Sequence, residues 1–205
     1  MSTALQYPGP DVSVRGLPLE ERRGIYAMWC VIATEGALFA SFFAAYFYLG
    51  SNKERWQVDH PPKLLVAFIL LAILVASSFV LEWGKRRVRE RRYAAGRLLL
   101  AVTIFMGLVF LALQGYEYKD HWKTLTPFSD SYGSIFYVIT SFHAAHVIVG
   151  LLMLTYVLVL PRYAPARETP FRPYETVALY WHFVDVVWVF VVLILYVIPN
   201  LIAHG

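Results

Sequence analysis

The sequence has few charged residues and almost no cysteine. Of its 205 residues, 16% are charged and 59% are hydrophobic, and the mean hydropathy is +0.54. Because soluble domains carry about 25% charged residues, this composition indicates a polytopic membrane protein with little chain left for a soluble domain. Cys30 is the only cysteine, which excludes a disulfide within the chain and a cysteine-based metal site.

Several motifs that indicate a catalytic or binding activity are also absent from the sequence. The sequence contains no CxxCH haem-attachment site, no glycine-rich phosphate-binding loop and no nucleophile elbow. Residues 1–24 contain no apolar core segment, so we expect no cleavable signal peptide. The first apolar run is long enough to act as an uncleaved insertion signal. No catalytic centre is evident from the motifs.

Long apolar runs dominate what the sequence does contain. A bilayer core of about 30 Å needs about 20 apolar residues per helix. Five runs reach that length, at residues 26–49, 63–83, 97–116, 134–160 and 177–202. They lack the alternation expected of the strands of a membrane barrel. The sequence therefore predicts an all-α membrane bundle of five helices over residues 26–205, preceded by a cytoplasmic tail over residues 1–25.

The basic residues of the connections predict the orientation of this bundle. Seven of them lie in residues 85–97, three in the tail and three between the fourth and fifth runs, whereas the other two connections together hold five. Because cytoplasmic loops carry the excess of Lys and Arg, we expect the N-terminus inside and the C-terminus outside. The isoelectric point near 9.2 then reflects orientation and contact with anionic headgroups, and predicts no nucleic-acid partner.

Ionisable side chains lie inside three of the apolar runs at similar depths. Glu35 is in the first run, His143 and His146 are in the fourth, and His182 and Asp185 are in the fifth. At about 1.5 Å per helical residue, all five fall in the middle part of the bilayer. Each costs at least about 2.5–3.5 kcal/mol there on insertion scales. We therefore expect them to satisfy one another across helices in one shared polar cluster.

Three interpretations of such a cluster are open. Histidines and carboxylates on several helices resemble, in outline, the metal sites of carboxylate–histidine bundles, although those sites usually use more carboxylates than this chain offers. Intramembrane Glu, His and Asp also form proton relays. The third interpretation is a hydrogen-bonded lock between helices. Such a lock stabilises a bundle when every member has a hydrogen-bond partner. The residues alone favour the lock.

A polar motif also marks the outer end of the third run. Gln114 and Glu117 lie there with Tyr116 between them. We expect Glu117 to be solvated or to pair with Lys119 or Lys123.

Four motifs resemble those of subunit III of the haem–copper respiratory oxidases, and they occur in that family's order. ATEGALFASFFAAYF (33–47) contains a buried glutamate, and YGSIFYVITSFHAAHVIVG (132–150) contains an FHxxH pair. LALQGYEYKD (111–120) is similar to the end of the helix before that pair. ALYWHFVDVVWVFVVLILYV (178–197) resembles the family's last helix. The resemblance covers most of the chain, from about residue 33 to residue 188.

The resemblance implies a supporting rather than a catalytic role. Subunit III of this family binds no haem or copper, which lie in the catalytic subunit I. It packs on that subunit, holds phospholipids and helps to sustain proton uptake while the complex reduces oxygen to water and pumps protons. We therefore expect partners in subunit I, other oxidase subunits and phospholipids, and a location in a bacterial inner membrane.

The resemblance also assigns roles to particular residues. Glu35 carries over as the family's buried glutamate, bonded to His143 or His146, and His182 and Asp185 carry over as its His-x-x-Asp pair. Lipid phosphates in the family meet basic and aromatic residues, for which Arg162 and Trp181 are the candidates here.

One departure separates this chain from the long form of the family, which has seven spans. The first two spans are missing here, as in the five-span versions of many bacterial cytochrome c and quinol oxidases. Because those spans form one arm of a lipid-filled cleft, we expect another subunit to complete it. The alternatives are an accessory subunit of nitric oxide reductase from the same family, an independent small transporter or channel, and a metalloenzyme.

Overall fold

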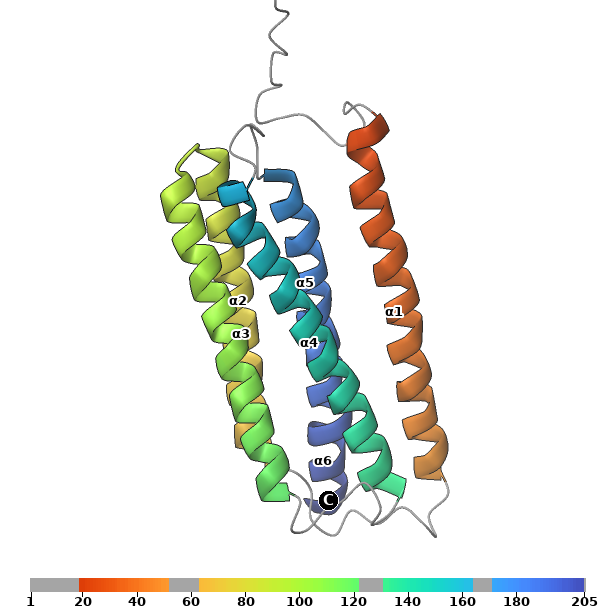
Figure 1. Cartoon of the computed structure of the whole chain (residues 1–205). Coiled ribbons are helices and arrows are strands. Elements are labelled where there is room, and N and C mark those ends of the chain that lie inside the picture. The colour runs from red at the N-terminus through yellow and green to blue at the C-terminus, as the bar shows by residue number, and fades with distance from the viewer. Residues whose placement is uncertain (1–18, 52–62, 122–130, 164–170, 205) are drawn as a thin grey trace, which may run out of the picture.

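The chain forms a bundle of long helices that run side by side (Figure 1). The computed structural model describes residues 19–51, 63–121, 131–163 and 171–204, and the regular structure within these residues is helical throughout. Five stretches are long and apolar enough to cross a membrane, which confirms the predicted all-α fold with five spans. The elements are α1 (Leu19–Ser51), α2 (Leu64–Arg89), α3 (Tyr93–His121), α4 (Ser131–Tyr163), α5 (Phe171–Val191), η3 (Val192–Val197) and α6 (Ile198–His204).

The helices are longer than the apolar runs that predict them. α1 begins at Leu19, inside the residues predicted as a tail, and α2 continues through its basic end to Arg89. Polar residues can extend a helix beyond the bilayer core, because the backbone hydrogen bonds of an α-helix are all internal. The orientation of the bundle remains a prediction from charge.

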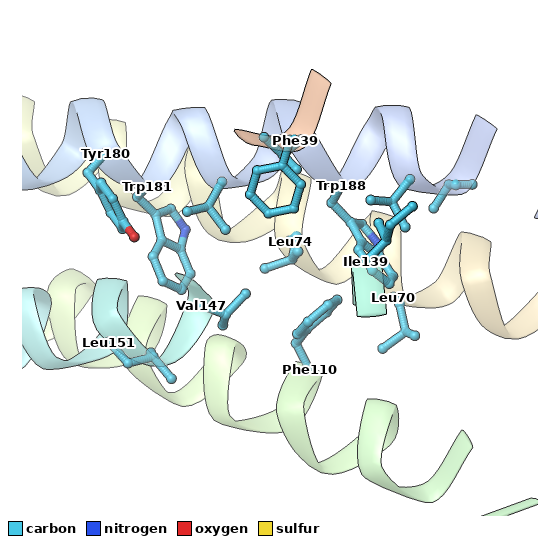
Figure 2. Close-up of a cluster of buried hydrophobic side chains, with 14 of the residues drawn as sticks. Phe39, Leu70, Leu74, Phe110, Ile139, Val147, Leu151, Tyr180, Trp181 and Trp188 are labelled. Atoms are coloured by element: carbon cyan, nitrogen blue, oxygen red, sulfur yellow. The ribbon is translucent and has the colours of Figure 1, made fainter. Parts of the chain in front are cut away.

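α5 lies at the centre of the bundle. It packs against α1, α2 and α4, and half of its span is buried (50%), compared with 11% for α1. Figure 2 shows Trp181 and Trp188 of α5 among side chains of the neighbouring helices. Phe110 of α3 meets the Trp188 ring edge to face, with 5.0 Å between the ring centroids. Large aromatic side chains of α5 therefore fill the space between the other helices.

The ring of Trp181 packs closely against two glycines. A Cβ on Gly107 of α3 would lie 2.9 Å from Trp181 Cη2, and a Cβ on Gly150 of α4 would lie 2.8 Å from Trp181 Cε3. The indole N–H donates to Ser77 Oγ of α2 at 2.9 Å. Side chains or backbone of three helices thus fix the position of this one ring.

A tight turn joins α2 to α3. The Arg92 N–H bonds to the Arg87 carbonyl at 2.9 Å, and the Arg91 N–H bonds to the Val88 carbonyl at 3.0 Å, which is the Schellman pattern at the end of a helix. Arg91 has a φ of 59°, where glycine is the usual residue. The short turn places α3 directly beside α2, and this pair has the most extensive contact in the bundle.

Ion pairs join neighbouring helices at both ends of α2. Lys63, just before α2, bonds to Asp120 of α3 at 2.8 Å, and the hydrogen bond and charge of that carboxylate raise the pKa of Lys63. At the other end, Arg89 bonds to Glu175 of α5 at 3.1 Å. Both pairs are partly exposed, so each contributes little to stability on its own.

The last span contains a π-helical segment that the sequence analysis did not predict. η3 follows α5 without a break and is followed by α6. Pro199 has no N–H to donate to the Leu195 carbonyl four residues earlier. The Tyr132 hydroxyl of α4 donates to that carbonyl at 2.9 Å. A neighbouring helix therefore supplies a donor to the Leu195 carbonyl in this irregular segment.

Candidate functional site: two polar groups within the bundle

Glu35 and His146 connect α1 to α4. His146 Nε2 lies 3.0 Å from Glu35 Oε2, and His146 Nδ1 lies 2.7 Å from the Phe142 carbonyl oxygen. A carbonyl can only accept, so Nδ1 carries a proton. Nε2 then either accepts a hydrogen bond from a neutral Glu35 or, as an imidazolium, donates one to the Glu35 carboxylate. Both arrangements satisfy the two side chains and attach α1 to the bundle.

His143, one turn away on α4, takes no part in this pair. Its side chain is fully enclosed. The ring stacks on Trp188 with 4.7 Å between centroids and 28° between planes, and it meets Phe39 and Phe110 edge to face. Neither ring nitrogen has a hydrogen-bond partner among the described residues. Of the FHxxH pair, therefore, only the second histidine contacts the glutamate.

His182 and Asp185 belong to a second polar group, between α5 and α2. The Ser78 hydroxyl of α2 donates to Asp185 Oδ2 and lies 3.0 Å from His182 Nδ1. His182 Nε2 lies 3.8 Å from Glu82 Oε2, and Glu82 also bonds to Lys85 at 2.6 Å. This group thus runs through side chains of two helices from a charged pair to a buried carboxyl.

The five predicted residues therefore do not form one shared cluster. The structure divides them into the Glu35–His146 pair and the α2–α5 group, with His143 enclosed by aromatic rings. Depth in the membrane places a residue along its helix but does not give its direction around the helix axis, and the single-cluster prediction rested on depth alone. Sequence reasoning missed Ser78 and Glu82. The sequence did contain a signal for them, because Glu82 is the one carboxylate in the second apolar run.

The outer-end motif differs from its prediction as well. Glu117 is 3% exposed rather than solvated, and it accepts a hydrogen bond from the Tyr196 hydroxyl of η3 at 3.2 Å. Gln114 is buried beside it, whereas Tyr116 is exposed. Gln114 and Glu117 therefore face the bundle, and Tyr116 faces outward.

The two candidate lipid contacts have different positions. The Trp181 ring is fully buried among side chains of this chain, so its described neighbours are protein rather than lipid. Arg162 lies near the end of α4, and its side chain is outside the described part of the chain.

Side chains of this chain surround both histidines of the FHxxH pair. His146 is committed to Glu35, and aromatic rings enclose His143 on several sides, which leaves no face for a porphyrin. Among the described residues, no group of three or more His, Cys, Asp or Glu side chains is arranged to hold a metal ion.

Comparisons with known proteins identify the family. The sequence profile of cytochrome c oxidase subunit III matches residues 21–199. Cytochrome c oxidase subunit 3 of Synechocystis is 36% identical, over 82% of this chain and 72% of its own length. A probable cytochrome c oxidase subunit 3 of Nocardia farcinica is 34% identical, over 92% of this chain and 95% of its own length. The relative in Corynebacterium diphtheriae is 34% identical over 82% of this chain.

These relatives confirm the resemblance that the four motifs predict. They are subunits of an oxidoreductase complex, and their similarity extends over nearly the whole bundle. Together with five helices that can span a membrane, this similarity describes a multi-pass membrane protein whose partners are other oxidase subunits. The chain belongs to the cytochrome c oxidase subunit III family.

Proposed function

We propose that this chain is the non-catalytic subunit III of a proton-pumping haem–copper terminal oxidase in a bacterial inner membrane. It packs on the catalytic subunit I, holds phospholipids and sustains proton uptake, while its partners hold the haem and copper. The observation that carries this proposal is the family match over residues 21–199 in a chain with five membrane-spanning helices.

The polar groups support a structural role for most of the ionisable residues. Glu35 bonds to His146 across α1 and α4, and Asp185 bonds to Ser78 across α5 and α2. Breaking a partly or fully buried polar pair by removing one member is costly, because the other member then loses its partner. These pairs therefore keep helices in register beside the subunit that carries out the oxygen chemistry.

α1 has little contact with the rest of the bundle, and this supports a protein partner on its exposed face. Much of α1 is exposed, and its exposed positions include two pairs of small residues four apart, Ala33 with Ala37 and Ala40 with Ala44. Small residues at this spacing allow helix backbones to approach closely in lipid. A helix of another oxidase subunit would cover this face and bury a helix that the chain alone leaves open.

Side chains at the basic end of α2 support contact with phospholipid. Trp83 is half exposed, and the Arg87 guanidinium lies 5.6 Å from the centre of its ring. Tryptophan and arginine are favoured at the headgroup level of a bilayer. In our proposal this end faces the cytoplasm, as the charge distribution predicts, and Arg162 lies at the same side of the membrane.

Purification of the tagged chain from membranes in mild detergent tests the proposal. We expect a large haem-bearing subunit to co-purify, visible on a subunit gel and in the reduced-minus-oxidised visible spectrum, with oxygen consumption in the same fraction. An unrelated multi-pass protein carrying the same tag is the control. Recovery of the chain as a lone, haem-free protein would contradict the proposal, and nitric oxide reduction without oxygen consumption would favour the accessory-subunit alternative.

A further inference from the structure

The α2–α5 group links a buried carboxyl to the edge of the bundle through a series of neighbouring polar side chains. Asp185 is 7% exposed, whereas the side chains of Glu82 and His182 are 34% and 40% exposed. Ser78 stands between them, in contact with both Asp185 and His182. The series therefore begins at a partly exposed acid, Glu82, and ends at a buried one, Asp185.

A lock between the two helices does not require this length. The Ser78–Asp185 hydrogen bond alone joins α2 to α5 and satisfies one carboxyl oxygen. His182 and Glu82 add a titratable imidazole and a second acid, each placed further toward the exposed side. Every member of the series can both give and receive a proton, which a purely structural contact does not need.

We propose that Glu82, His182 and Ser78 form a proton-exchange path through which Asp185 takes up protons from the aqueous phase at the basic end of α2. The path itself is built only from residues of this chain. Its use in proton uptake by an oxidase rests on the proposed function. Intramembrane acids and histidines commonly mark proton relays, and here Ser78 completes the contact between them.

The proton balance of one uptake step follows from the geometry. The starting state has Asp185 ionised and accepting from the Ser78 hydroxyl, while Ser78 accepts from the Nδ1–H of a neutral His182. Protonated Glu82 gives its proton to Nε2, across the 3.8 Å that separates the two atoms and that one water molecule can bridge. His182 passes its Nδ1 proton to Ser78, and Ser78 passes its own to Asp185. One proton moves from Glu82 to Asp185, and the imidazole changes tautomer.

The charged groups around the path are placed to supply it with protons. On α2, Lys85 bonds to Glu82 at 2.6 Å, and Glu82 and Lys85 are the charged groups that act electrostatically on His182. On α5, the Tyr174 hydroxyl donates to the backbone carbonyl of Leu81, next to Glu82. On α1, Glu35 is held by His146 of α4. Lys85 thus connects the Glu82 end of the path to the headgroup region, into which long lysine side chains extend.

Infrared spectroscopy after a rapid change of pH tests the path. The chain is purified in lipid nanodiscs with whatever subunits accompany it, and the carboxyl C=O band of protonated Asp185 is identified as the band that is lost in Asp185→Asn. We expect the band to respond at least tenfold more slowly in Ser78→Ala and in Glu82→Gln than in the wild type. Ser78→Thr keeps a hydroxyl and should respond at the wild-type rate.

Matched variants separate the path from general damage. Ser77→Ala removes the neighbouring hydroxyl, which serves Trp181 instead, and Glu175→Gln neutralises an acid that serves Arg89. Both should respond at the wild-type rate. If Ser78→Ala fails to fold, Glu82→Gln, at a partly exposed position, provides the test. A wild-type rate in the folded path variants, or no titrating band lost in Asp185→Asn, would overturn the proposal. This answer holds whether or not a haem-bearing subunit co-purifies, so it is independent of the proposed function.

Discussion

Substituting Gly107 by alanine perturbs a tightly enclosed point of the bundle, beside the Trp181 ring. The new Cβ would lie 2.7 Å from Leu151 Cδ2 and 2.9 Å from Trp181 Cη2, closer than non-bonded carbons pack. Leu151 ends in a flexible methyl group and can turn away. Trp181 cannot, because Gly150 lies against the adjacent ring edge and Ser77 holds the indole N–H.

The expected loss of stability is the difference between two effects. Inserting a methyl group into a well-packed core costs about 1–3 kcal/mol, and the confined ring places Gly107→Ala at about 3 kcal/mol. Replacing glycine by alanine within a helix returns about 1 kcal/mol. The net result is a destabilisation of about 2 kcal/mol, which lowers the melting temperature by about 4–8 °C for a chain of this size.

Gly115→Ala is the matched control on the same helix. A Cβ at Gly115 meets nothing within 4 Å, so this variant has the helix-propensity gain without the clash and should melt no lower than the wild type. Both variants are compared with the wild type by thermal unfolding in the same detergent. Equal melting temperatures for Gly107→Ala and Gly115→Ala would refute the reasoning, because they would mean that the Trp181 ring has room to move.

Three further substitutions test other contacts. Glu35→Ala leaves His146 without its carboxyl partner, at a cost of about 1–3 kcal/mol, and should reduce the haem that co-purifies with each chain; unchanged complex yield and detergent stability would contradict this. Asp185→Asn should reduce sustained turnover more than the initial rate of electron transfer, measured by oxygen uptake and stopped-flow spectroscopy; normal assembly with immediate loss of electron transfer would count against it. Arg91→Gly relieves a left-handed backbone and should stabilise the α2–α3 turn by about 0.5–1 kcal/mol; a lower melting temperature would show that the arginine side chain holds the turn.

The fold could be predicted from the sequence because lipid leaves a chain few choices. A run of about 20 apolar residues must form a helix, since every backbone polar group needs an internal partner. The helix ends were less predictable. Charged residues such as Glu20 and Glu21 extend α1 beyond the bilayer core, and hydropathy alone gives no sign of that extension.

The candidate site was predicted in its members but not in its arrangement. Glu35, His146, His182 and Asp185 all make polar side-chain contacts, as their cost in a membrane requires. Which helix each one faces depends on the packing of the large rings of α5, and sequence spacing does not contain that information. Ser78 was missed because a serine within a membrane span usually bonds to its own backbone, and its contact with Asp185 appears only when α2 and α5 are placed together.

The π-helical turn of η3 has a consequence for aligning this chain with its relatives. Each π turn takes up one more residue than an α turn, so residues after η3 are rotated by about 100° from the positions that an unbroken α-helix would give them. Tyr196 lies near the end of η3 and reaches Glu117 on α3. A relative that is one residue shorter in this segment can keep the same contact with a regular helix. A single-residue gap between Val192 and Val197 in an alignment would therefore mark a change of backbone geometry rather than a change of partner.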